Sequence, residues 1–197
     1  MIIEMKRRKY TLKQRALQQE RTRERIVDAA MALHEELGPA ETTISALAER
    51  AGVQRLTVYR HFADEHEILR ACSSKWFGLH PPPDIADVPD SAPVDRTRAA
   101  LRELFKYYEE TRDMWSSLYR DLDRTPALEA PMSVFESYLS SLCRELATGW
   151  AASRPKRLRA TLAHALRFST WQSLTRQGLQ RNAMTNLVCD WIVAAAK

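Results

Sequence analysis

Residues 42–62 read TTISALAERAGVQRLTVYRHF, and the rest of the chain can be interpreted outward from this stretch. Its first part has apolar residues at the spacing of one helix face: Ile44, Leu47, Ala48 and Ala51. A hydroxyl side chain can cap the start of this helix, at Thr42, Thr43 or Ser45. Gly52 then supplies the open backbone that a tight turn between two helices needs. The stretch therefore predicts two short helices joined at a glycine.

The second helix of this pair has two different faces. Val53, Val58 and Phe62 are expected to point inward. The other side chains provide hydrogen-bond donors, cations and flat rings over the outer face and its flanks: Gln54, Arg55, Leu56, Thr57, Tyr59, Arg60 and His61. Such a set suits a helix that lies in the major groove of DNA. The alternative is an ordinary helical hairpin within an all-α domain.

The run Ile-x-x-Leu-Ala-Glu-Arg-Ala-Gly-Val-x-x-x-Thr-Val-Tyr-Arg-His-Phe closely resembles the recognition module of the tetracycline-repressor (TetR) family. The resemblance covers residues 21–75, and Thr-Val-Tyr-Arg-His-Phe is its most specific part. It implies an all-α fold of about nine helices. An N-terminal three-helix head would carry the helix-turn-helix, and a C-terminal helical body would bind a ligand and dimerise.

The resemblance also implies a division of the DNA contacts. Phosphate contacts are expected from Thr43, Tyr59 and His61, and base-edge contacts from Gln54, Arg55 and Thr57. Leu56 could meet a thymine methyl group, and Arg60 completes the predicted DNA-binding set. Family members often carry a lysine that touches a phosphate where this chain has Glu65. A glutamate there would repel DNA, so we do not expect that contact.

The chain of 197 residues has a net charge of +5, and this charge is concentrated at one end. Residues 1–25 contain nine Lys or Arg and three Glu. We expect a basic N-terminal arm made of Lys6, Arg7, Arg8, Lys9, Lys13, Arg15, Arg21 and Arg23. Such an arm can neutralise phosphates or reach the minor groove. A solvated basic tail that makes no DNA contact is the alternative.

Other patterns argue against an enzyme, a metal site or a membrane protein. The three cysteines, Cys72, Cys143 and Cys189, have no CxxC spacing and predict neither a zinc site nor a disulfide framework. The histidines form no HExxH pattern, and neither a glycine-rich phosphate loop nor a GxSxG motif occurs. We find no membrane-length apolar run and no signal peptide. The expectation is a cytoplasmic protein that is not an enzyme and needs no cofactor.

A proline-rich stretch marks the clearest boundary in the chain. Residues 81–93 hold five of the nine prolines, with three aspartates among them. We therefore predict a DNA-binding domain over residues 1–80, a stiff linker over 81–94 and a ligand-binding and dimerisation domain over 95–197. Apolar periodicity predicts body helices over about 95–112, 128–150, 155–178 and 182–197, with a shorter helix before Pro126.

The body suggests two further sites. Dimerisation is expected through the last two helices, at Leu162, Ala165, Leu166, Ser169, Val188 and Trp191. An unidentified small-molecule effector is expected among Phe105, Tyr108, Trp115, Tyr119, Tyr138, His164, Arg167, Phe168 and Trp171. Aromatic residues at helical spacing are also what a plain core requires. The resemblance as a whole implies a ligand-responsive bacterial repressor that binds a palindromic operator as a homodimer. The alternative function is a helical interaction or small-molecule-binding module with a degenerate DNA head.

Overall fold

The computed structural model is all-α, as predicted. It describes residues 2–84 and 92–197, with side chains from residue 13 onward. Within these residues the chain forms ten α-helices and three short 3-10 turns, and no strand. None of these helices is both long enough and apolar enough to cross a membrane. The predicted linker falls mostly on residues 85–91, outside the described part of the chain, as do the side chains of the basic residues at 6–9.

The chain divides into two compact units, which are described separately below. The first contains Met1–Leu79 together with Ser116–Glu129, and the second contains His80–Trp115 together with Ala130–Lys197. The sequence did not predict that residues 116–129 pack with the N-terminal helices. Consequently, α6 (Arg112–Asp121) begins in the second unit and ends in the first.

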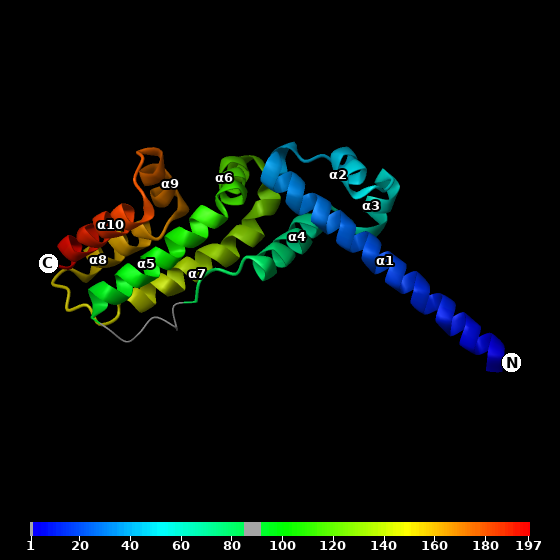
Figure 1. Cartoon of the computed structure of the whole chain (residues 1–197), viewed down its shortest axis with the longest axis horizontal. Coiled ribbons are helices and arrows are strands. Elements are labelled where there is room, and N and C mark those ends of the chain that lie inside the picture. Colours follow the sequence, from blue (N-terminus) through cyan, green and yellow to red (C-terminus); the bar gives the residue numbers. More distant parts are fainter. Residues whose placement is uncertain (1, 85–91) are drawn as a thin grey trace. The chain divides into compact units, whose positions relative to one another are not determined.

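The first unit is built around a long N-terminal helix (Figure 1). Helix α1 (Ile2–Glu36) packs against both α2 (Ile44–Ala51) and α4 (Glu65–Leu79), and α2 packs against α3 (Arg55–His61). Apolar side chains from all four helices form the core, among them Ile26, Leu33, Leu47, Val58, Leu69 and Trp76. Helix α1 ends at Glu36, just before the glycine at position 38.

A buried carboxylate organises the turn after α1. Asp121 has no exposed surface, and its Oδ2 accepts a hydrogen bond from the Ala40 backbone N–H at 3.1 Å. The neighbouring Arg120 donates to Asp121 Oδ1 at 2.9 Å and to the Leu37 carbonyl at 2.6 Å. Gly38 follows with a φ of 94°, in the region that favours glycine. The end of α6 therefore fixes how the chain leaves α1 and enters α2.

The second unit is a helical bundle in which the last helix packs beside several others (Figure 1). Helix α10 (Arg181–Ala196) packs against α5 (Pro93–Glu110) and α8 (Pro155–Ala165), and it also touches α9 (Phe168–Arg176). Helix α7 (Glu129–Ala147) contributes Phe135, which lies against Trp115 with ring centroids 4.1 Å apart. An aromatic core thus joins α5, α7, α9 and the start of α6.

The single helix predicted over residues 155–178 is wrong, because the chain breaks it at Leu166 and Arg167. Arg167 has an extended backbone, with φ −74° and ψ 143°. The Leu166 carbonyl accepts a hydrogen bond from the Tyr108 hydroxyl at 2.7 Å. The Thr170 N–H, which would bond to the Leu166 carbonyl in a continuous helix, donates to the Arg167 carbonyl. The Thr170 hydroxyl donates to the His164 carbonyl. The break raises the number of α-helices in the described residues from the expected nine to ten.

Candidate nucleic-acid interface

Both ends of α2 are capped, and the cap at its end begins the turn into α3. Thr43 is the N-cap, because its Oγ1 accepts the Ala46 backbone N–H at 3.1 Å. Of the three candidate caps in the sequence, the structure uses this one. Gly52 closes the helix in the left-handed conformation (φ 64°, ψ 42°), and its N–H bonds to the carbonyls of Ala48 and Glu49. Since a capping hydroxyl only accepts this bond, the Thr43 proton remains available to donate to a phosphate.

Helix α3 separates its side chains into a buried face and an exposed face. Val58 is completely buried and Phe62, directly after the helix, is 1% exposed, while Val53 is half-buried. On the outer face, Leu56 is 61% exposed and Tyr59 is 50% exposed. The outer face therefore presents a large apolar side chain and an aromatic ring to solvent.

The predicted DNA-binding residues all lie on the outer face of α3, on its flanks or at the start of α2. The exposed members are Thr43, Gln54, Arg55, Leu56, Tyr59 and Arg60. Thr57 and His61 are half-buried, at the flanks of α3. We name the set Gln54, Arg55, Leu56, Thr57, Tyr59 and Arg60 the α3 outer face. The structure thus presents one cation-bearing, donor-rich helix surface, with Thr43 at the start of the preceding helix.

Arg23 on α1 holds the end of α3 in place. Its guanidinium lies over the Phe62 ring, 4.7 Å from the centroid, where a cation is attracted to the ring face. The charge pattern of the sequence places Arg23 in the basic arm but carries no signal of this contact, because the two residues are far apart along the chain. Arg23 therefore has a structural role in positioning the residues that follow α3.

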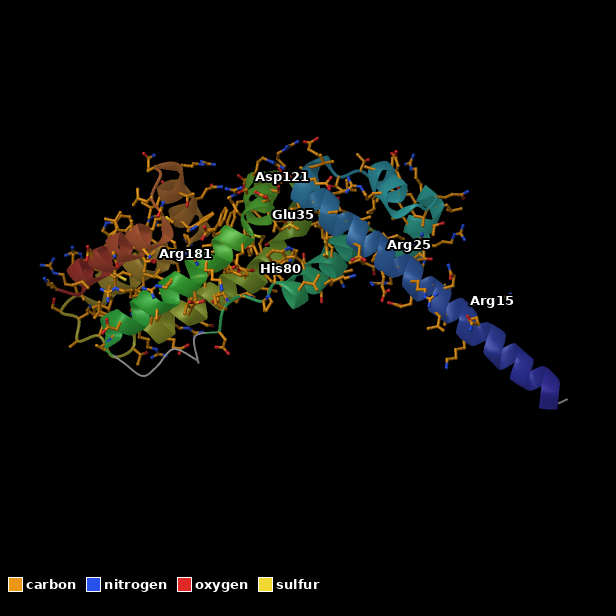
Figure 2. All side chains as sticks on the ribbon, in the orientation of Figure 1. Arg15, Arg25, Glu35, His80, Asp121 and Arg181 are labelled. Atoms are coloured by element: carbon orange, nitrogen blue, oxygen red, sulfur yellow. The ribbon has the colours of Figure 1, made fainter. Side chains whose placement is uncertain are left out.

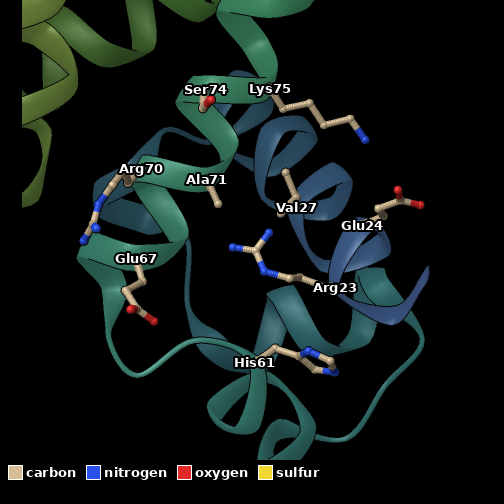
Figure 3. Close-up of a pocket in the computed structure, with 9 residues that line it drawn as sticks. All are labelled: Arg23, Glu24, Val27, His61, Glu67, Arg70, Ala71, Ser74 and Lys75. Carbon is tan, nitrogen blue, oxygen red and sulfur yellow. The ribbon is translucent and has the colours of Figure 1, made fainter. Parts of the chain in front are cut away.

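Next to this contact the first unit has a cleft of about 560 Å³ between α1, α4 and the end of α3 (Figure 3). Arg23 points into it from α1, and His61 closes it on the side of α3. Arg70 and Lys75 extend from α4 on opposite sides, and Lys75 forms an ion pair with Asp28 of α1. The cleft carries more basic than acidic groups, so it adds positive charge beside α3.

The start of α4 carries three carboxylates, Asp64, Glu65 and Glu67. Asp64 Oδ1 accepts the Glu67 N–H at 2.9 Å, and Glu67 Oε2 accepts the Ala63 N–H at 2.8 Å. These two bonds form a reciprocal cap at the beginning of the helix. Glu65 is exposed and makes no ion pair among the side chains that the structure describes. This edge of the head is therefore less favourable for phosphate than the α3 outer face.

Exposed basic residues continue along α1 away from the core. Lys13, Arg15, Arg21 and Arg25 are all exposed, and Arg15 and Arg25 can be followed along the helix in Figure 2. Because α1 is a continuous helix from Ile2, these charges sit on a regular scaffold. Among the described side chains, no group of three His, Cys, Asp or Glu residues could hold a metal ion.

The predicted effector residues are mostly packed together in the core of the second unit. Phe105, Tyr108, Trp115, Phe168 and Trp171 are at most 2% exposed. Tyr108 lies 5.4 Å from Phe168 and 6.0 Å from Trp171, measured between ring centroids. Tyr138 is half-buried and donates to the Pro83 carbonyl at 2.8 Å, and Tyr119 belongs to the first unit. His164 and Arg167 are exposed. The rings fill space in this conformation, and the two polar candidates lie apart from them at the surface.

The predicted dimer residues also divide into two groups. Leu162, Ala165, Leu166 and Val188 have no exposed surface within a single chain, so they support the last helices from inside. Ser169 and Trp191 are exposed, and 37% of Trp191 is accessible. Helical periodicity alone identified the apolar side of α8 and α10. Periodicity could not distinguish the face of these helices that packs within their own bundle from a face that would contact a second copy of the chain.

Comparisons with known proteins single out the first unit. Residues 26–72 match the family model described as bacterial regulatory proteins, tetR family. Over 56 residues the chain is 41% identical to the HTH-type transcriptional regulator SrpR of Pseudomonas putida. It is 39% identical, also over 56 residues, to TtgW, an uncharacterized HTH-type transcriptional regulator from the same species. These matches take in 28% of this chain and only 26% and 42% of the two relatives.

The likeness in fold extends over almost the whole chain. A TetR-like transcriptional regulator from Rhodococcus sp. RHA1 superposes with a TM-score of 0.66, covering 89% of this chain and 97% of that one. The two sequences are 19% identical, so this comparison concerns the fold alone. The helix-turn-helix sequence and the family model agree: residues 26–72 match the tetR family of bacterial regulatory proteins, within a chain whose fold resembles that of a TetR-like regulator over most of its length.

Proposed function

We propose that the protein is a cytoplasmic, sequence-specific DNA-binding transcriptional regulator that acts as a homodimeric repressor on a palindromic operator. A small-molecule effector bound to the second unit would release it from DNA. The chain spans less than half the length of the curated relatives that it matches, so these properties are inferred from its own residues and from the family.

The observation that carries the proposal is the α3 outer face. Arg55 and Gln54 can each make two hydrogen bonds to one base, guanine and adenine respectively. Leu56 offers an apolar contact for a thymine methyl group, and Tyr59 offers a hydroxyl for a phosphate. In water the exposed Leu56 has no apolar partner to bury it, whereas a major groove would supply one.

A single α3 reads only a few base pairs, so specificity requires two heads. In twofold dimers the reading helices lie about 34–36 Å apart and contact two half-sites of a palindrome. One flank of α10 supports such a dimer, because it presents apolar residues that its own bundle leaves wholly or partly exposed: Ala183, Leu187, Trp191 and Ala194. Helix α8 adds the exposed Ala160 and Ala163. We name these six residues the α8–α10 apolar flank and propose that a second copy covers it.

The effector would act by binding more tightly to one arrangement of the two heads than to the other. Its effect on DNA affinity cannot exceed this difference in binding free energy. The second unit supplies helices α5 and α7 to α10 for such a site, and α6 links it covalently to the first unit. This continuity supports a route from an effector in the second unit to the DNA-binding helices.

The proposal is tested by selecting binding sites from a random duplex library at near-physiological salt with the full chain. We expect one palindrome with two equal half-sites. The double variant Arg55→Ala, Tyr59→Ala serves as the matched control and is expected to enrich nothing. Enrichment of the same palindrome by this control would place the reading surface elsewhere. If the wild type enriches no sequence, the result would favour the alternative function, a helical interaction or small-molecule-binding module whose DNA-binding head is degenerate.

A further inference from the structure

The second unit contains a cleft that lies beside the aromatic core and is open to solvent. Its volume is about 700 Å³, within the range that binds drug-sized molecules. It is formed by α5, the start of α6, α9 and the turn into α10. Two kinds of lining residue matter for its chemistry. Three are arginines, Arg102, Arg112 and Arg181, and three are apolar, Trp171, Leu179 and Met184.

Three apolar side chains are among the lining residues. Trp171 and Met184 are only 2% and 3% exposed, so they support the wall of the cleft from inside the bundle. The Thr175 hydroxyl bonds to the Trp171 carbonyl at 2.9 Å and lies 3.7 Å from the Met184 sulfur. Leu179, half-buried, extends the same surface. An apolar group that packs against Leu179 would remove its accessible surface from water.

The outer part of the cleft is cationic. The single carboxylate among the lining residues is Glu109, which forms an ion pair with Arg181 at 3.4 Å. Within the described part of the chain, Arg112 pairs with its neighbour Asp113 alone, at 3.3 Å, and both side chains are more than half exposed. Such exposed pairs contribute little and exchange readily with another anion. Arg102 has no ion pair among the side chains that the structure describes.

The backbone adds to this positive character. Helix α10 begins in the cleft, and its N-cap residue Gln180 makes no capping hydrogen bond with its side chain. The first turn of α10 contains no acidic residue. The first N–H groups of a helix favour negative charge. Three guanidinium groups and these N–H groups therefore add positive charge to the lining of the cleft.

We propose that this cleft binds an amphipathic organic anion, with its carboxylate or sulfonate held by Arg102 or Arg112 and its apolar body against Leu179. A neutral molecule of the same shape would gain only the apolar contact. A cation would be repelled by three arginines against one glutamate. Binding of such an anion does not depend on DNA binding, and its test uses the full chain alone.

The test compares two fluorescent probes that share a ring system and differ in charge. 8-Anilinonaphthalene-1-sulfonate is an anion, and N-phenyl-1-naphthylamine is its uncharged counterpart. Titrations in a buffer free of phosphate and sulfate give the dissociation constant of each probe. The wild type is expected to bind the sulfonate about tenfold or more tightly than the neutral probe, as lost charge-assisted hydrogen bonds would predict.

The double variant Arg102→Gln, Arg112→Gln is expected to lose this preference while keeping its affinity for the neutral probe. Both side chains are exposed, so the variant should fold, which circular dichroism and thermal unfolding would verify. The matched control is Arg157→Gln, an exposed arginine on α8 outside the cleft, which should behave as wild type. Decanoate should displace the sulfonate probe, and decanol should not. Equal affinities of the wild type for both probes, or an unchanged preference in the double variant, would overturn the proposal.

Discussion

Single residues decide how the first unit is held together, and Asp121 is the central one. Burial opposes ionisation of this carboxyl, but the hydrogen bond from Arg120, the Ala40 N–H and the charges of Arg120 and Arg124 outweigh it and lower its pKa. A buried ionised carboxylate needs such partners, because an unpaired one would be costly. Asp121 thereby ties the end of α6 to the turn after α1.

Gly38 is the residue that this arrangement constrains most. A Cβ atom at this position would overlap the Arg120 guanidinium and the Asp121 carboxylate, and φ is already positive. We expect Gly38→Ala to lower the free energy of unfolding by about 2 kcal/mol or more, in urea titrations followed by circular dichroism. Gly78→Ala is the matched control, since nothing lies within 4 Å of a Cβ there and the residue is helical. It should stabilise by about 0.5–1 kcal/mol. A neutral Gly38→Ala would show that the turn is not constrained as described.

His34 makes the stability of the first unit dependent on pH. Burial lowers its pKa from 6.5 to about 4, although the charge of Asp121 acts in the opposite direction. The unfolded chain therefore binds a proton between pH 6.5 and 4 that the folded chain does not, so stability falls as the pH falls through this range. The lost free energy of unfolding should reach about 3 kcal/mol.

This pH dependence is isolated by comparing the wild type with His34→Gln. The difference between their free energies of unfolding, measured in urea between about pH 7.5 and pH 4, should change steadily once the pH falls below the ordinary histidine pKa. The exposed His66, replaced by glutamine, is the control and should follow the wild type. Parallel curves for the wild type and His34→Gln would contradict the assignment of this effect to His34.

At the scale of helices, the local sequence predicted the helix-turn-helix in detail. Gly52, the cap at Thr43 and the inward Val58 and Phe62 all follow from signals within a few residues of one another. The break between α8 and α9 could not be predicted in this way. At the break the Leu166 carbonyl accepts the hydroxyl of Tyr108, 58 residues away, in place of a helical N–H.

The candidate sites could likewise be predicted only where their residues are close together in the sequence. The outer face of α3 is a local pattern and was predicted, whereas the cleft with Arg102, Arg112 and Arg181 combines residues from three separated segments. The aromatic residues chosen for an effector pocket have the spacing of core residues. Whether such a ring lines a cavity or fills one depends on its neighbours in space, for example Phe135 against Trp115.

The cap of α2 gives a prediction that belongs to this scale. Thr43→Ala removes the acceptor of the Ala46 N–H and should lower the free energy of unfolding by about 1 kcal/mol. Ser45→Ala, two residues later and also exposed, is the control and should change stability by less than about 0.5 kcal/mol. Thermal unfolding of both variants measures the difference. Equal effects would mean that the hydroxyl of Thr43 does not stabilise α2.

At the scale of the whole molecule, the proposed regulator requires two copies. Trp191 lies on the α8–α10 apolar flank, and a charge at its position would face the same charge on the partner. Trp191→Glu is therefore expected to convert a dimer into a monomer in sedimentation velocity experiments. Asn186→Glu adds the same charge on the polar side of α10 and should remain dimeric. A dimer that survives Trp191→Glu would place the interface on another surface.

The claim that the α3 outer face reads DNA is tested most directly by the affinity of two variants for two duplexes. Fluorescence anisotropy would compare the selected palindrome with a shuffled duplex of the same composition, at fixed salt. Arg55→Ala should reduce the preference for the palindrome by about 1–3 kcal/mol per half-site, whereas Tyr59→Ala should weaken both duplexes to a similar extent. Equal losses for both variants on both duplexes, or no loss for either, would contradict the account.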